Sequence, residues 1–266
     1  MGIVNLTHDS FSDGGRYLEP AVAVEQARRL AEAGADILDL GAESTRPGAA
    51  PVSEGEELDR LLPVLEALVP LGRPVSVDTM KARVMRVAIE AGASMVNDVR
   101  ALREPGALEA VAGSHAAVCL MHMQGEPRTM QHAPQYDDVL GEVCAFLAER
   151  ARACRAAGVE ADRIVLDPGY GFGKTPAHNL HLLARQRSIA DLGYPLLAGL
   201  SRKSLIGHIT GRAVGDRLAG SLAAALIAVQ RGARIIRVHD VAPTRDALAV
   251  WAALGEAGHL PIEDAH

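Results

Sequence analysis

The chain has 266 residues, of which 48% are hydrophobic and 23% charged, so it can bury a sizeable core and is not predicted to be disordered. Its net charge of -6 argues against a general nucleic-acid-binding protein, which would normally present a basic face. No apolar run is long enough for a membrane span and no basic-then-apolar leader opens the chain, so neither a membrane protein nor a signal peptide is predicted. Three cysteines without a CxxC pair favour reduced thiols and a cytoplasmic location.

Eight short apolar segments alternate with longer helical patterns along the whole chain. The predicted strands are Gly2–Leu6, Asp36–Leu40, Val75–Val77, Met95–Asn97, Ala117–Met121, Ile164–Leu166, Leu196–Ala198 and Ile235–Val238. They contain few polar alternations, as expected of parallel strands that are buried on both faces. The clearest helical patterns are Val22–Ala33, Glu54–Leu71, Leu140–Ala157, Gly220–Arg231 and Pro243–Glu256.

Three of the helical segments end in a glycine just before a strand. We expect Gly34, Gly92 and Gly232 to take the left-handed cap conformation that ends a helix. The repeated strand–helix alternation predicts an α/β fold, a (β/α)₈ TIM barrel that forms one domain over residues 1–260, with a tail at 261–266. Met1 opens directly onto the first strand, so we expect nothing to plug the lower end of the barrel.

Polar residues follow every predicted strand, and in a TIM barrel the active site lies at the carboxyl ends of the strands. Eight polar strand ends would be costly unless they lined a solvated ligand site. Asp78, Asn97, Asp167 and Lys203 follow four different strands and should converge in the mouth of the barrel. Carboxylates that accept from ring N–H groups, with an amide and an ammonium group beside them, suit a heterocycle such as a pteridine or a purine.

Other strand ends carry groups suited to phosphate and to a divalent cation. Arg237 and His239 follow the eighth strand, where barrels often hold phosphate. Arg46 is a further cation on the long loop after the second strand, and arginine offers fork-like donors to phosphate. Asn5, at the end of the first strand, supplies an oxygen of the kind that Mg²⁺ prefers.

Several polar residues have a simpler structural interpretation. Asp98 and Asp240 each follow a strand and are interpreted as helix N-caps. His122 is interpreted as a hydrogen-bonded structural histidine rather than a ligand. The glycines of the segment Gly169–Gly173 resemble a phosphate loop, but their spacing lacks the full fingerprint.

Six motifs in order resemble the dihydropteroate synthases of folate biosynthesis, and the resemblance covers nearly the whole chain. The motifs span Asn5–Gly15, Glu43–Gly48, Ser76–Thr79, Asp167–Lys174, Ser201–Ser204 and Arg237–Asp240.

The resemblance implies a transferase that condenses 6-hydroxymethyl-7,8-dihydropterin pyrophosphate with p-aminobenzoate, by dissociative loss of pyrophosphate and without a covalent enzyme intermediate. It also implies a homodimer and a Mg²⁺ cofactor contacted by Asn5. The implied pterin ligands are Asp78, Asn97, Asp167 and Lys203, with Met121 nearby; the pyrophosphate ligands are Arg46, Arg237 and His239; the p-aminobenzoate pocket is shaped by Thr45, Phe172 and Ser204. The catalytic roles fall to Asp78, Asp167, Lys203 and Arg237.

Two alternatives share the pterin-binding residues. One is a pterin-binding paralogue without synthase activity. The other is a methyltetrahydrofolate-binding methyltransferase domain, which should lack the cluster of Arg46, Arg237 and His239.

Overall fold

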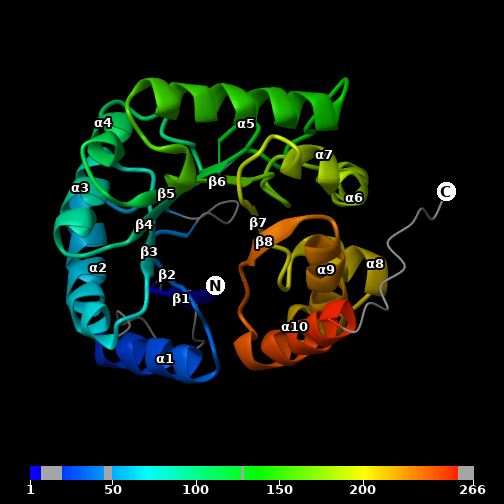
Figure 1. Cartoon of the computed structure of the whole chain (residues 1–266), viewed down its shortest axis with the longest axis horizontal. Coiled ribbons are helices and arrows are strands. Elements are labelled where there is room, and N and C mark those ends of the chain that lie inside the picture. The colour runs from blue at the N-terminus through cyan, green and yellow to red at the C-terminus, as the bar shows by residue number, and fades with distance from the viewer. Residues whose placement is uncertain (7–19, 45–49, 127–128, 257–266) are drawn as a thin grey trace.

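Eight parallel strands in sequential order form the centre of the molecule, as Figure 1 shows. The computed structural model describes residues 1–6, 20–44, 50–126 and 129–256. The strands are β1 (Gly2–Asn5), β2 (Leu38–Gly41), β3 (Val75–Asp78), β4 (Met95–Asp98), β5 (Ala117–Met121), β6 (Ile164–Asp167), β7 (Leu196–Ala198) and β8 (Ala233–Ile236). A parallel bridge between Gly2 and Val238 closes the sheet, and the Ile3 amide donates to the Val238 carbonyl at 3.0 Å.

Helices surround this barrel, so the predicted (β/α)₈ fold is confirmed (Figure 1). They are α1 (Pro20–Glu32), α2 (Glu54–Leu68), α3 (Ala82–Glu90), α4 (Ala107–Ala112), α5 (Val139–Ala156), α6 (Pro176–Ala184), α7 (Gln186–Ala190), α8 (Ser204–Thr210), α9 (Leu218–Gln230) and α10 (Val241–Glu256). Single 3₁₀ turns occupy η2 (Val69–Leu71), η3 (Ala161–Arg163) and η4 (Val214–Asp216). Two α-helices follow β6 and two follow β7, where one each was expected.

The two faces of the barrel wall carry different side chains because successive residues of a strand point to opposite faces. The outward residues, such as Leu38, Leu40 and Val77, pack against the helices in the main hydrophobic core. The lower interior is filled by a second apolar cluster of Met1, Met95, Cys119, Val165 and Leu197. Met1 therefore occupies part of the lower end that we expected to be unplugged.

The glycine caps are confirmed, because Gly34, Gly92 and Gly232 have φ angles of 92°, 105° and 97°. This left-handed conformation ends each helix and turns the chain into the next strand. β8 begins two residues earlier than predicted, directly after Gly232, so Arg237 lies just beyond the end of its strand.

Among the described residues, no helix is long and apolar enough to cross a bilayer. These residues form a single barrel domain. The predicted tail at 261–266 lies outside them.

Candidate active site

One row of residues crosses four strands at the mouth of the barrel. In the register of the sheet, Asn5 pairs with Gly41, Gly41 with Asp78, and Asp78 with Asn97. Gly41 has no side chain, and a Cβ there would lie 3.6 Å from the Asp78 Cβ, so the Asp78 side chain lies against the Gly41 backbone. The sheet thus gathers three predicted site residues at one level, with Asp167 at the end of β6.

Arg237 connects the end of β8 to carboxylates of two other strands at the mouth, Asp39 of β2 and Asp78 of β3. Its Nη2 donates to Asp78 Oδ2 at 3.0 Å, and its Nε donates to Asp39 Oδ2 at 2.6 Å. Asp39 is fully buried in β2, and we did not predict it as a site residue. The available signal was an acidic residue flanked by Leu38 and Leu40 within an otherwise apolar strand.

Burial moves the pKa values of three mouth residues, Asp78, Asp167 and Lys203, toward neutrality. Desolvation raises the pKa of Asp78 to about 7, against the opposing attraction of Arg237. Desolvation also raises the pKa of Asp167, which Lys203 partly offsets. The pKa of Lys203 falls to about 8 because burial disfavours its charge more than Asp167 favours it. Pairs of acids and bases with such shifts are typical of functional sites.

The segment after β6 places polar and aromatic groups side by side. Asp167 Oδ1 accepts a hydrogen bond from the Gly169 amide at 2.7 Å, which fixes the carboxylate. Lys203 Nζ donates to the Tyr170 carbonyl and lies 4.8 Å from the centroid of the Phe172 ring. A cation above an aromatic face is favourable, so Phe172 and Lys203 form a joint surface.

An apolar wall adjoins the polar mouth. Phe172 packs on a cluster of buried side chains that includes Met121. The other buried members of the cluster are Val99, Met123 and Met130. Methionine is flexible and polarizable, so this wall suits a flat aromatic ligand.

The glycines after β6 allow two loops to touch. Gly169 and Gly173 have φ angles of 67° and 59°. A Cβ on Gly169 would lie 1.9 Å from the His122 carbonyl oxygen, and one on Gly173 would lie 2.3 Å from the Gln124 carbonyl oxygen. These glycines therefore serve the contact between the loops after β5 and β6, which explains their spacing without a phosphate.

His122 has the structural role that we predicted. The Lys174 ammonium group lies 2.9 Å from His122 Nδ1 and donates to the carbonyls of Gly169 and Phe172 at 3.1 and 3.0 Å. Burial lowers the pKa of His122 to about 3 and that of Lys174 to about 7. The neutral imidazole thus accepts from Lys174, and the pair holds the loop that carries Asp167.

The segments after β7 and β8 brace one another. Ser201 Oγ accepts from the His239 amide at 3.2 Å and lies 3.0 Å from His239 Nδ1. Arg202 has a φ of 57°, and its Nε donates to Asp240 Oδ2 at 2.9 Å. The carboxylate of Asp240 therefore binds a neighbouring loop, which the interpretation as a helix cap missed.

The remaining predicted residues have mixed outcomes. Asp98 is not a helix N-cap, because the next helix, α4, begins at Ala107 after Gly106. Its carboxylate instead accepts from the amides of Arg100 and Leu102 at 2.8 and 2.7 Å, in the turn after β4. Ser204 is exposed at the first residue of α8. Thr45 and Arg46 lie outside the described residues, although Glu43, just before them, accepts from the Val52 amide at 3.1 Å.

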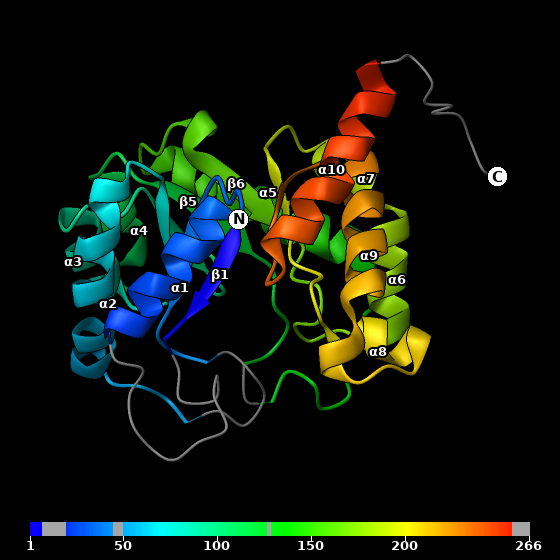
Figure 2. The ribbon, with the colours of Figure 1, turned by 90° about the horizontal axis from the view of Figure 1, so that it is seen from below.

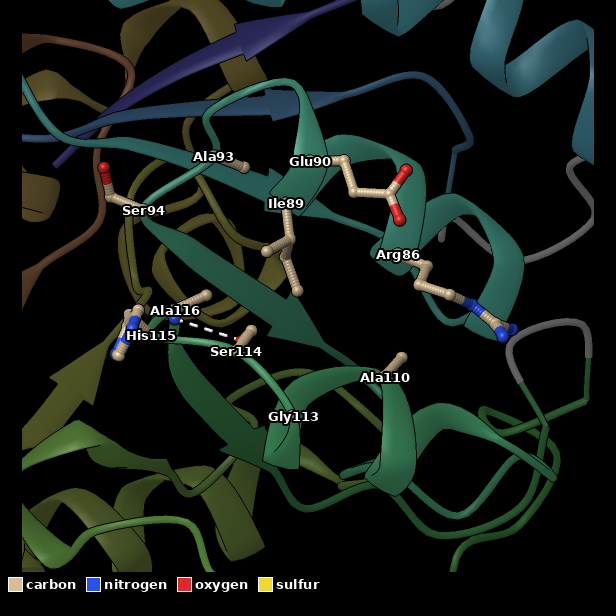
Figure 3. A pocket seen from close by; sticks show the side chains of 10 residues that line it. All are labelled: Arg86, Ile89, Glu90, Ala93, Ser94, Ala110, Gly113, Ser114, His115 and Ala116. Atoms are coloured by element: carbon tan, nitrogen blue, oxygen red, sulfur yellow. Dashed lines mark hydrogen bonds between the residues drawn. The ribbon is translucent and has the colours of Figure 1, made fainter.

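A cavity lies at the opposite end of the barrel from this mouth, between α3 and α4 (Figure 3). Its lining includes Ser94 and His115, which precede β4 and β5. Ser114 Oγ is already bonded to the Ala116 amide at 3.1 Å. Because catalytic residues of TIM barrels come from the carboxyl ends of strands, the candidate site is the mouth and not this cavity.

Comparison with known proteins identifies the family of the chain. A family described as pterin binding enzyme matches residues 1–239 of the chain. A dihydropteroate synthase of Haemophilus influenzae is 50% identical over 258 residues, which cover 97% of this chain and 94% of the relative.

Two solved structures extend the similarity to the fold. The Yersinia pestis dihydropteroate synthase, in a sulfonamide drug complex, has a TM-score of 0.92 at 49% identity and covers 96% of this chain and 93% of its own. The Xanthomonas albilineans dihydropteroate synthase with 4-aminobenzoic acid has a TM-score of 0.90 at 55% identity and covers 96% of this chain and 92% of its own. The chain therefore belongs to the pterin-binding enzymes, as a member of the dihydropteroate synthases.

Proposed function

We propose that this chain condenses 6-hydroxymethyl-7,8-dihydropterin pyrophosphate with p-aminobenzoate, giving 7,8-dihydropteroate and pyrophosphate. The observation that carries the proposal is the joining of Asp78 and Arg237 at 3.0 Å, with Lys203 and Asp167 in the same mouth. Carboxylates for ring N–H groups thus lie beside a cation for phosphate. The relatives reported above carry the synthase name, and this favours catalysis over either alternative, a silent paralogue or a methyltransferase domain.

The pterin would lie in the polar half of the mouth. Asp78 and Asp167 accept from the ring N–H groups and the exocyclic amine, whereas Asn97 and Lys203 engage the ring nitrogens and carbonyl. Met121 supplies an apolar contact from the adjoining wall. All of these side chains except Lys203 belong to strands, so the site is held in place before the substrate arrives.

The pyrophosphate would lie toward β8. Arg237 and His239 stand at the carboxyl end of that strand, and Ser201 orients the His239 ring. Departure of the pyrophosphate leaves positive charge on the pterin methylene, which the Asp78 and Asp167 carboxylates stabilise. The arylamine is a sufficient nucleophile for this cation, so the step needs no strong base and no covalent link to the enzyme.

A magnesium ion fits the mouth through few protein ligands. Asn5 presents a half-buried carboxamide in line with Asp78, and the described residues contain no group of three His, Cys, Asp or Glu side chains able to hold a metal. Mg²⁺ retains waters and binds phosphate oxygens, so one Asn5 oxygen suffices. When bound, it would neutralise charge on the pyrophosphate.

The p-aminobenzoate ring would lie on the outer side of the pterin, against Phe172 and Lys203. Lys203 Nζ above the Phe172 ring gives this position both a cation and an apolar face. Ser204 is exposed next to Lys203 and can reach the same ligand. We assign Thr45 and Arg46 to this pocket and to the pyrophosphate, respectively, on the resemblance alone.

The proposal is tested by pyrophosphate release with the pterin pyrophosphate, p-aminobenzoate and Mg²⁺ omitted in turn. Release should require all three, and mass spectrometry should find no pterin adduct on the protein. Asp167→Asn should lower kcat by about a hundredfold, because it removes an anion that stabilises the cation. Asp162→Asn, at an exposed position in η3, is the matched control. Wild-type turnover in Asp167→Asn would contradict the assignment.

A homodimer through the last helices is supported by exposed apolar residues. Ten large hydrophobic side chains are exposed in the described part of the chain, and six of them lie between α8 and α10. These six are Ile209, Val214, Leu218, Ile227, Val250 and Leu254. Figure 2 shows α8, α9 and α10 together on one side of the molecule.

The free cysteines support the cytoplasmic location expected from the sequence.

A further inference from the structure

Asp39 connects two residues of the proposed ligand site from beneath. Its Oδ2 accepts from Arg237 Nε at 2.6 Å and from Asn97 Nδ2 at 3.3 Å. Asp39 itself is 0% exposed, one level below the row that holds Asp78 and Asn97. The carboxylate is therefore buried under the site and reaches the reactants only through its neighbours.

The contact with Asp39 determines how Asn97 faces a ligand. A carboxylate accepts hydrogen bonds but does not donate them, so the Asn97 amide must turn its NH₂ group toward Asp39. The Asn97 carbonyl oxygen is then directed elsewhere, as an acceptor for a ring N–H. Without Asp39 both orientations of the amide become available, and the donor–acceptor pattern shown to the pterin is no longer unique.

Asp39 also fixes the direction of the Arg237 guanidinium. Within the described residues, Asp39 takes Nε and Asp78 takes Nη2, which together form one edge of the fork. The Nη1 group is thus turned away from both carboxylates and is available to an anionic ligand. A guanidinium held by two partners needs little reorganisation when the pyrophosphate binds.

We infer that Asp39 is a positioning residue for this reaction, which sets the Asn97 amide for the pterin and the Arg237 guanidinium for the pyrophosphate. The inference rests on the proposed function, because it takes the pterin pyrophosphate as the ligand. It adds to the site a residue that cannot touch either substrate. Its signature is a selective one: recognition of the pterin pyrophosphate depends on Asp39, whereas recognition of p-aminobenzoate does not.

Steady-state kinetics of Asp39→Ala test this selectivity. The KM for the pterin pyrophosphate should rise about tenfold or more, as expected when charge-assisted hydrogen bonds lose their common acceptor. The KM for p-aminobenzoate should stay within about twofold. Asp39→Asn keeps an acceptor oxygen without the charge. Its KM for the pterin pyrophosphate should lie between those of the wild type and Asp39→Ala.

Ser76→Ala is the matched control. Ser76 pairs with Asp39 in the sheet, is equally buried, and its hydroxyl makes no hydrogen bond within the described residues. It should behave as wild type. The inference would be overturned if the KM values of Asp39→Ala equalled those of Ser76→Ala. It would also be overturned if the KM for the pterin pyrophosphate and the KM for p-aminobenzoate rose equally in Asp39→Ala. A wild-type chain that fails to release pyrophosphate contradicts the proposed function instead.

A second background covers the case in which Asp39→Ala does not fold because Arg237 loses a partner. Arg237→Met removes the guanidinium charge, and Asp39→Ala is then introduced into the Arg237→Met variant. Once Arg237 is gone, Asn97 is the remaining hydrogen-bond partner of Asp39 within the described residues. Calorimetry of a pterin without pyrophosphate therefore measures how Asp39 acts through Asn97. The double variant should bind this pterin more weakly than Arg237→Met does, and equal affinity would overturn the inference.

Discussion

At the scale of single residues, the mouth of the barrel places more negative than positive charge in a buried space. Asp39, Asp78 and Asp167 face Lys203 and Arg237. Burial raises the pKa of Asp78 to about 7 and lowers that of Lys203 to about 8, so each charge is held weakly in the free enzyme. A cationic or hydrogen-bond-rich ligand gains from this imbalance, since it relieves the repulsion among the carboxylates.

These pKa values predict a bell-shaped pH profile of kcat/KM for the pterin pyrophosphate. Asp78 accepts ring N–H groups through both oxygens, and with a negative charge, only as an anion, so kcat/KM should fall as the pH drops through about 7. Lys203 loses its charge as the pH rises through about 8, which should produce the alkaline limb. Well below the first pKa, the fall should approach about tenfold per pH unit.

The substrate phosphate also titrates, so a pterin without pyrophosphate is the control ligand. Its affinity, measured by calorimetry between about pH 5.5 and about pH 9, should show the same acid limb. Asp78→Asn should bind it weakly but without that limb. An acid limb that persists in Asp78→Asn would belong to another group.

Residue positions were predictable where they follow a strand. Asp78, Asn97 and Asp167 come after buried apolar runs, and a parallel barrel brings such positions to one end. Asp39 was not predicted because it lies inside a strand, where its neighbours Leu38 and Leu40 suggest a plain buried segment. Its partner Arg237 is 198 residues away, so only the closed barrel reveals the pair.

At the scale of elements, a buried ion cluster joins the segment after β2 to the start of α3. Lys81 Nζ lies 2.7 Å from Glu43 Oε2 and also binds Glu57 of α2. Glu57 is fully buried, and burial raises its pKa above the usual range for a glutamate. Two carboxylates and one ammonium group thus connect α2 and the start of α3 to Glu43, after β2.

Lys81→Met should lower the free energy of unfolding by about 3–5 kcal/mol, because it leaves buried carboxylates without their partner. The loss should shrink as the pH falls, since a protonated Glu57 needs no cation. Urea denaturation at two pH values measures both effects.

Arg83→Met on the same helix is the control for Lys81→Met. Arg83 lies 3.8 Å from Glu54 in an exposed pair, and such pairs contribute at most about 1 kcal/mol. Equal losses of stability in the two variants would show that the Lys81 cluster has no special role.

The eight strands were predictable in number and order, whereas the ends of the elements and the number of helices were less so. The caps at Gly34 and Gly92 set two boundaries correctly, because a left-handed residue cannot continue a helix. The division of the sixth and seventh helical regions was not predicted. Arg185, with φ of -109° and ψ of 16°, separates α6 from α7 without a proline or glycine, so no residue type marks the break.

At the scale of the whole molecule, the apolar residues on α8–α10 predict association of two copies. Val250→Glu with Leu254→Glu places charge on the exposed part of α10 and should shift the protein from dimer to monomer in sedimentation equilibrium. Val22→Glu changes a residue of similar exposure on α1 and should leave the mass unchanged. A monomeric wild type would contradict the proposed dimer.

The seam between β1 and β8 has a consequence for the chain while it is being made. The Ile3 amide and the Met1 carbonyl are paired with Val238, near the other end of the barrel sequence. Until residue 238 has left the ribosome, β1 has only β2 beside it, and its other edge can pair with a strand of a foreign chain. The nascent protein therefore remains open to aggregation, and to chaperone binding, until its eighth strand has emerged.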